Sequence, residues 1–189
     1  MLKRITLVLA TLLFVMVVPA LAREDACRTG KVAGSYTRTQ SNVDVFGDGS
    51  VIHTFIFQLN VHSDGTADEY WTGYPDYMIN TGTNSTSYGS WTCRQNGTMV
   101  VTLIQAGYTP ILTSANVPNP DVELALYSRT TELFSIVDSN TIQRTQARTR
   151  RYGPNQDPAD PAGGLLRPLN TTVAEYKRLQ ASDADLLLP

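Results

Sequence analysis

The chain contains two histidines, and the residues around one of them suggest acid–base or binding chemistry. His53 falls on the apolar face of an expected strand, where a neutral imidazole could act as a general base or donate to a ligand near pH 7. The alternative, which the apolar pattern fits better, is a core histidine with satisfied hydrogen bonds. His62 lies beside a turn, and we expect it to be solvated. No Gly-x-Ser-x-Gly or similar nucleophile motif accompanies either residue, so the sequence assigns no catalytic residue.

Aromatic residues form the second candidate site, because they bury a large area at low entropic cost and recur in ligand and protein contacts. Phe55 and Phe57 share the strand face of His53, and Tyr70 and Trp71 follow in the next expected strand. Tyr70 and Trp71 are neighbours, so the alternative is that they point to opposite faces and only one of them is exposed. The predicted ligand-binding residues are His53, Phe55, Phe57, Tyr70, Trp71 and Trp91.

Charged residues give weaker signals. Arg144, Arg148 and Arg150 alternate along the last expected strand, where they could bind an anion or a carboxylate partner. A solvated outer face that protects a sheet edge explains the same row, and we favour that interpretation.

The stretch from Asp44 to Ser50 resembles only part of a calcium loop, because the twelve-residue spacing and the closing Glu are missing. We therefore predict no metal and no cofactor.

The segment that carries His53 gives the clearest strand pattern in the chain. Alternate residues from 51 to 61 share one face that is mostly apolar, and alternation of this kind marks a strand with one buried face. Ser63-Asp64-Gly65 follows as a hairpin turn, and Asn96-Gly97 gives a second strong hairpin signal later in the chain. The expected strands are 34–40, 51–62, 66–73, 89–94, 98–104, 122–128, 133–137 and 141–152.

About eight short antiparallel strands with one buried face predict an all-β domain. Because consecutive hairpins favour an up-and-down meander, we expect an antiparallel barrel, with a β-sandwich as the alternative. Residues 153–170 are rich in proline and glycine and predict a linker or a surface strap. Thr172 to Glu175 fits a capping box, so a short C-terminal helix is preferred over a strand for residues 171–189.

Two similar units begin strands, Gly34-Ser35-Tyr36 and Gly89-Ser90-Trp91. Together with the hairpin-linked strands and a terminal helix, they make the chain resemble a lipocalin-like (calycin) barrel. In that family the Gly-x-Trp unit lies in the first strand, whereas here the first strand carries Tyr36 and the tryptophan comes mid-chain. The resemblance implies a cup for a ligand but names no ligand.

The first 22 residues have the layout of a secretory signal peptide. A basic start is followed by an apolar run from Ile5 to Pro19 and by the small-x-small site Ala20-Leu21-Ala22. We expect cleavage after Ala22, with an uncleaved anchor as the alternative. The predicted organisation is a signal peptide at 1–22, a β-barrel domain at 23–152, the linker at 153–170 and the helix or tail at 171–189.

Export would place the chain in an oxidising compartment, secreted or periplasmic. The chain has two cysteines, Cys27 and Cys93, and an isolated pair in that setting predicts a disulfide. Neither cysteine belongs to a Cys-x-x-Cys pair or lies beside a histidine, which argues against a metal site.

The formal net charge of −2 argues against nucleic acid as a partner, because a basic surface would be expected for it. No later segment is apolar enough to span a bilayer, so we predict no stable membrane insertion after cleavage. The preferred function is an exported, non-enzymatic barrel that binds a small, partly apolar molecule. The alternatives are a structural or envelope-interaction protein with a filled barrel, and a small barrel enzyme that uses His53.

Overall fold

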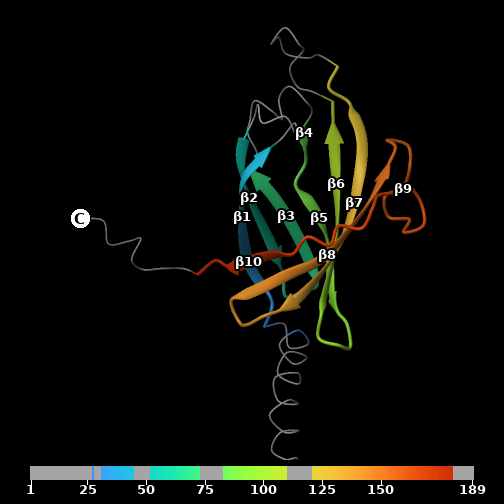
Figure 1. The fold of residues 1–189 in the computed structure, drawn as a ribbon. Coiled ribbons are helices and arrows are strands. Elements are labelled where there is room, and N and C mark those ends of the chain that lie inside the picture. The colour runs from blue at the N-terminus through green and yellow to red at the C-terminus, as the bar shows by residue number, and fades with distance from the viewer. Residues whose placement is uncertain (1–26, 28–30, 45–51, 73–82, 110–120, 181–189) are drawn as a thin grey trace, which may run out of the picture.

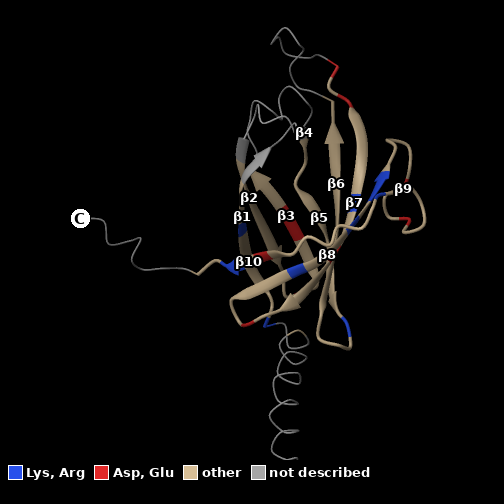
Figure 2. Ribbon diagram, in the orientation of Figure 1, with Lys and Arg blue, Asp and Glu red and all other residues tan. Residues whose placement is uncertain are grey.

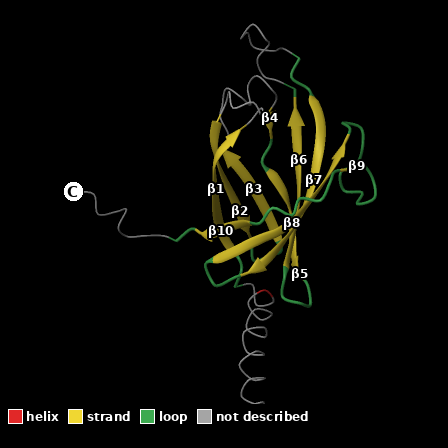
Figure 3. Ribbon diagram, in the orientation of Figure 1, coloured by secondary structure: helices red, strands yellow, loops and turns green. Residues whose placement is uncertain are grey.

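The computed structural model describes residues 27, 31–44, 52–72, 83–109 and 121–180. Strands and loops make up nearly all of this part of the chain (Figure 3). The strands are β1 (Gly34–Asp44), β2 (Ile52–Val61), β3 (Thr66–Thr72), β4 (Thr83–Asn84), β5 (Ser87–Cys93), β6 (Met99–Tyr108), β7 (Leu124–Ile136), β8 (Thr141–Tyr152), β9 (Leu165–Leu166) and β10 (Ala174–Arg178).

These strands form one antiparallel sheet that closes into a barrel (Figure 1). The circle runs β1, β2, β3, β5, β6, β7, β8 and β10, and β10 returns to β1. The short strands lie outside this circle, since β4 pairs with β6 and β9 pairs with β8. The predicted all-β, eight-stranded antiparallel barrel is confirmed.

The prediction of a C-terminal helix is wrong, and the alternative prediction of a strand is confirmed. Residues 174–178 form β10, which pairs with the first half of β8 and with the start of β1. Ala174 and Tyr176 are buried, whereas Val173 and Leu179, which would join Tyr176 on the apolar side of a helix, are more than half exposed. The physical reason is that β1 and β8 each offer an unpaired edge, and a strand satisfies both edges where a helix would satisfy neither.

Two further expectations change. The segments 122–128 and 133–137 belong to one long strand, β7, so the eighth barrel strand comes from β10, beyond the predicted barrel segment 23–152.

In β8, an irregularity pairs Phe134 with Arg144 but Leu133 with Gln146, which leaves Thr145 as an extra residue. Because such a bulge shifts the alternation, Arg144 does not share the outer face of Arg148 and Arg150 as predicted.

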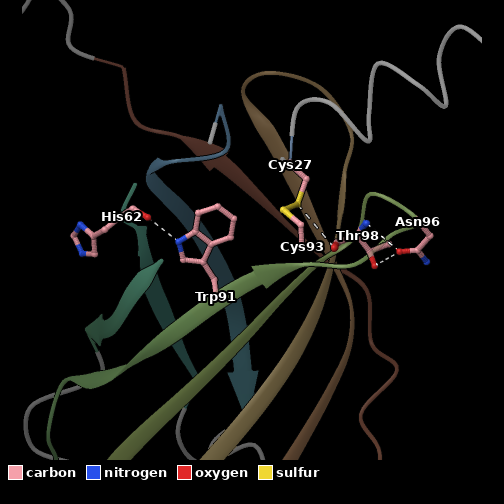
Figure 4. The surroundings of a disulfide bond; sticks show 6 residues. All are labelled: Cys27, His62, Trp91, Cys93, Asn96 and Thr98. Carbon is pink, nitrogen blue, oxygen red and sulfur yellow. Dashed lines mark hydrogen bonds between the residues drawn. A yellow bond between two sulfur atoms is a disulfide. The ribbon is translucent and has the colours of Figure 1, made fainter. Parts of the chain in front are cut away.

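One end of the barrel is filled by an apolar core. Its largest fully buried side chains are Tyr36, Tyr176, Phe134, Leu59, Met99, Ile142, Val101 and Cys27. The Cys27–Cys93 disulfide joins the chain before β1 to the end of β5, with Cα atoms 5.9 Å apart, which confirms the predicted pairing (Figure 4). Cys27 lies within this core, and Cys93 packs against it. We call this the disulfide end.

The two Gly-Ser-aromatic units both serve the disulfide end. Tyr36 donates from its hydroxyl to the carbonyl of Val32 (2.8 Å), and Trp91 donates from its indole nitrogen to the carbonyl of His62 (2.7 Å; Figure 4). Gly89 is required for a steric reason, because a Cβ atom there would stand 1.8 Å from the backbone oxygen of Thr102 on β6. The units therefore bring aromatic side chains to this end and let β5 and β6 approach closely.

Residues 153–170 form a surface strap whose second half returns along the edge of β8, as one of the two predicted interpretations had it. Arg150 and Arg151 pair with Leu166 and Leu165, and Ala147 forms a bridge with Asn170. The strap then crosses from β8 into β10. Among the described residues, no helix is long and apolar enough to cross a membrane.

Candidate functional site

A layer of charged and polar side chains crosses the barrel interior above the apolar core. It consists of Arg38 on β1, Glu69 on β3, Glu132 on β7, Arg144 on β8 and Tyr176 on β10. Glu69 is aligned with buried Ala67 on the inward face of its strand, and Glu132 is aligned with buried Phe134. Figure 2 shows the acidic segment of β3 and the basic segments of β1 and β8 on different walls of the barrel.

Glu132 and Arg144 form the best-buried ion pair of the described residues. An Arg144 Nη1 atom donates to Glu132 Oε1 at 3.0 Å, and the side chains are 4% and 12% exposed for Glu132 and Arg144, respectively. Burial raises the pKa of the Glu132 carboxyl, and the neighbouring Arg144 guanidinium opposes that rise. Glu132 Oε2 and Arg144 Nε are buried and make no hydrogen bond to the protein.

Glu69 is the second carboxyl of the layer. It accepts a hydrogen bond from the Tyr176 hydroxyl (3.3 Å). Burial, reinforced by the nearby Glu132 carboxylate, raises the pKa of Glu69 to about 8. Burial and the same two carboxylates also raise the pKa of the Tyr176 hydroxyl, so the phenol stays neutral. At neutral pH the Glu69 carboxyl is therefore mostly protonated. The guanidiniums of Arg38 and Arg144 then share at most one carboxylate, that of Glu132.

Arg38 connects the charged layer to an aromatic group. Its guanidinium carbon lies 4.0 Å from the ring centroid of Phe57 and 5.4 Å from that of Tyr176. Its Nη1 atom donates to Gln40 Oε1 (3.1 Å), while Nε is buried without a hydrogen-bond partner in the protein. A cation held between two ring faces keeps its charge available to a ligand.

Three of the predicted residues lie together beside Arg38. Phe55, Phe57 and Trp71 form an aromatic cluster with centroid separations of 5.5 to 6.4 Å. Phe57 and Trp71 are direct partners across β2 and β3, so they share the inward face. All three are partly buried, which leaves part of their surface accessible.

The other predicted residues lie elsewhere. Tyr70 points outward, is 41% exposed and donates to Gln58 Oε1. Trp91 lies at the disulfide end. His53 lies in β2 opposite Val43, and its side chain falls outside the described residues. Its proposed role in binding or catalysis stays a prediction, as does the role of the aromatic residues.

A pocket of about 490 Å³ reaches the charged layer from the barrel wall. It opens where β1 and β10 separate, since β10 pairs with β1 only at Tyr36 and Thr37. Both Arg38 and Arg144 line it. The other lining residues are Thr39, Gln40, Asn170, Thr172, Val173, Ala174 and Glu175. A pocket of this size accommodates a small organic molecule.

Sequence reasoning missed the charged layer, although a signal for it exists. Arg38 is two residues from Tyr36, and Glu132 is two residues from Phe134. A charged residue on the inward face of a strand is rare unless it has a partner. The alternation of residues in each strand therefore indicates that Arg38 and Glu132 point inward and need partners. Arg144 could not be found in that way, because the bulge at Thr145 is not visible in the sequence.

The layer can bind an anion or hold a proton, but it offers no group of metal ligands. Among the described residues, no cluster of three His, Cys, Asp or Glu side chains could hold a metal ion. The protonated Glu69 and the two guanidiniums are hydrogen-bond donors directed into the barrel.

Comparison of the chain with protein-family models, curated proteins and solved structures finds no match.

Proposed function

We propose that this protein is an exported, non-enzymatic barrel that binds a small, partly apolar molecule carrying an anionic group. The observation that carries the proposal is that Arg38 and Arg144 both line a pocket of about 490 Å³, where Glu132 is the carboxylate bonded to Arg144 and Arg38 has no carboxylate partner among the described residues. A guanidinium has five N–H donors, so an anionic ligand oxygen that enters the pocket can form a charge-assisted hydrogen bond with a donor that Glu132 and Gln40 leave free. The aromatic cluster beside Arg38 would hold the apolar part.

Export rests on the predicted signal peptide and is supported by the disulfide, which is consistent with an oxidising compartment. We expect the mature protein to begin at Arg23. Intact mass measurement of protein secreted or exported by its host tests this: a chain that retains residues 1–22 would contradict cleavage.

The binding proposal is tested with decanoate and decanol, which share an apolar chain and differ in charge. Trp71 stands in the aromatic cluster, so its fluorescence reports binding in a Trp91→Phe background. We expect decanoate to bind and to shift the Trp71 emission. No response to either compound would contradict ligand binding in this pocket.

Variants then localise the site. Arg38→Met keeps the length of the side chain and removes its charge, and we expect at least tenfold weaker decanoate binding. Arg148→Met is the matched control, because Arg148 lies on the outer face of β8, and it should leave decanoate binding unchanged. Equal loss in both variants would show that general charge, and not the interior site, attracts the anion.

A filled structural barrel is the second candidate, and the disulfide end favours it. Leu59 is fully buried there, and Phe134 packs edge-on against Tyr176 at 5.6 Å. If the remaining interior were equally inaccessible, neither compound would bind, and the outward Tyr70 would become the better candidate for contact with a partner.

A further inference from the structure

A second pocket lies on the outside of the barrel and shares no lining residue with the opening between β1 and β10. It has a volume of about 390 Å³ and lies between the outer faces of β6, β7 and β8 and the strap. We call it the strap groove. Its basic residues are Arg94, Arg129, Arg148 and Arg150, and its apolar residues are Val100, Leu133, Pro161, Leu166 and Leu169.

Two of the four arginines hold the strap. Arg129 donates to the carbonyls of Pro158 (3.3 Å) and Ala159 (2.6 Å). Arg150 donates to the carbonyls of Ala162 (3.4 Å) and Gly163 (3.0 Å). These bonds explain why the strap is fixed, but carbonyls neutralise none of the positive charge.

The guanidiniums of the remaining two arginines, Arg94 and Arg148, make no hydrogen bond or ion pair with other described residues. The only acid among the groove's lining residues is Glu132, and its carboxylate is bound to Arg144 inside the barrel. Among its lining residues, the groove is therefore a basic surface whose one carboxylate is already bonded elsewhere. Four guanidiniums in one groove favour an acidic occupant, since each can bind a carboxylate in a bidentate manner.

The apolar side chains of the groove are also left partly exposed to solvent. Leu166 and Leu169 are each 41% exposed, although they stand beside Val100 and Leu133 of the barrel wall. Exposed leucines next to arginines fit a segment that carries both acidic and aliphatic side chains.

The chain contains one such segment. Residues 181–189, which lie outside the described residues, read Ala-Ser-Asp-Ala-Asp-Leu-Leu-Leu-Pro. Two aspartates followed by three leucines match the charge and the apolar character of the groove. The segment follows Gln180 directly after β10, and β10 is the neighbour of β8, whose outer face forms one wall of the groove.

We propose that the strap groove binds the chain's own C-terminal segment, residues 181–189. Nine extended residues span at most about 30 Å. The segment leaves the barrel near Leu179, whose amide donates to the carbonyl of Ser35 on β1, and must pass the start of β8 to reach the groove, so the proposal requires it to be extended. This inference is independent of the interior ligand, since it uses the outer faces of β6 to β8 and none of the residues that line the interior opening.

The test uses the synthetic peptide ASDADLLLP and two forms of the protein, the full chain and a chain that ends at Gln180. We expect the peptide to bind the shortened chain and to bind the full chain at least tenfold more weakly, because the tethered segment competes at high effective concentration. Equal binding to both forms, or binding to neither, would overturn the proposal.

Variants assign the contact to the groove. Arg94→Ala with Arg148→Ala in the shortened chain should weaken peptide binding at least tenfold, while Arg167→Ala, an exposed arginine of the strap outside the groove, should not. A peptide with both aspartates changed to asparagine should lose affinity to a similar extent. Unchanged affinity in the double variant would contradict the assignment. A full chain that dimerises while the shortened chain stays monomeric would show binding between copies, which would overturn the assignment within one chain.

Discussion

The two ends of the barrel interior are built by the same eight strands but hold different chemistry. At the disulfide end, Tyr36, Leu59, Met99 and Ile142 are fully buried among apolar neighbours, and the Cys27–Cys93 bridge closes the structure. Towards the other end, the same strands direct Arg38, Glu69, Glu132 and Arg144 inward beside a pocket.

This difference indicates where stability and function separate in the fold. A packed apolar core gains free energy from burial and leaves no space for a ligand. Buried charges contribute little net stability and are retained where they give specificity or bind something. The disulfide end therefore holds the barrel together, and the charged layer is the part that is available for recognition.

The largest loss of stability is expected from removal of the bridge. Cys27→Ala with Cys93→Ala opens a loop with a sequence separation of 66 residues, which costs about 4 kcal/mol in the chain-entropy model. Urea denaturation measures the free energy of unfolding, and reduced wild-type protein should show the same loss. A loss below about 1 kcal/mol would mean that the apolar core alone secures this end.

Truncation of matched aromatic residues sharpens the comparison. Phe134→Ala removes a fully buried ring and should cost about 3 to 4 kcal/mol, because a cavity remains. Phe55→Ala removes a partly exposed ring near the pocket and should cost about 1 kcal/mol. Equal losses in urea denaturation would show that both ends are packed alike.

Breaking the buried ion pair tests the charged layer. Arg144→Met leaves the Glu132 carboxyl without its partner and should cost about 3 kcal/mol at pH 7. The double variant with Glu132→Leu should recover most of this loss, because it removes the unpaired group. If the double variant were no more stable than Arg144→Met, the ion pair would not be the cause.

The pH dependence of stability tests Glu69. Its folded pKa of about 8 lies above the ordinary value of 4.5, so the unfolded chain releases this proton first and stability falls as the pH rises from about 4.5 to 8. Glu69→Gln keeps the acceptor for Tyr176 and should match wild type at pH 4 but exceed its stability at pH 9, by about 5 kcal/mol for the full shift from 4.5 to about 8. A residual slope is expected, because the raised pKa of Glu132 acts in the same direction. Identical pH profiles would contradict the burial of a protonated Glu69.

The sequence was sufficient for most of the strands and for the disulfide, but not for the closure of the barrel. The alternation around Phe57 and Leu59 and the turn at Asn96-Gly97 are local, so β2 and the β5–β6 hairpin could be predicted. The strand at Ala174–Arg178 depends on the free edges of β1 and β8, which are distant in sequence. A local capping-box pattern therefore pointed to a helix that the tertiary pairing overrides.

The candidate site was predicted only in part, for a similar reason. Phe55, Phe57 and Trp71 follow from alternation and do lie together. The partners of Arg38 and Glu69 come from other strands, and the inward position of Arg144 depends on a bulge. Which charged groups meet in a barrel is decided by register across several strands, and no single segment carries that information.

The central claim is that the charged half of the interior, and not the disulfide end, receives a ligand. Amide chemical-shift mapping by NMR during a decanoate titration tests this most directly. We predict shifts at Arg38, Gln40 and Ala174 that saturate with decanoate, and unchanged signals at Leu59, Met99 and Ile142. Shifts at the disulfide end with none at Arg38 would contradict the account.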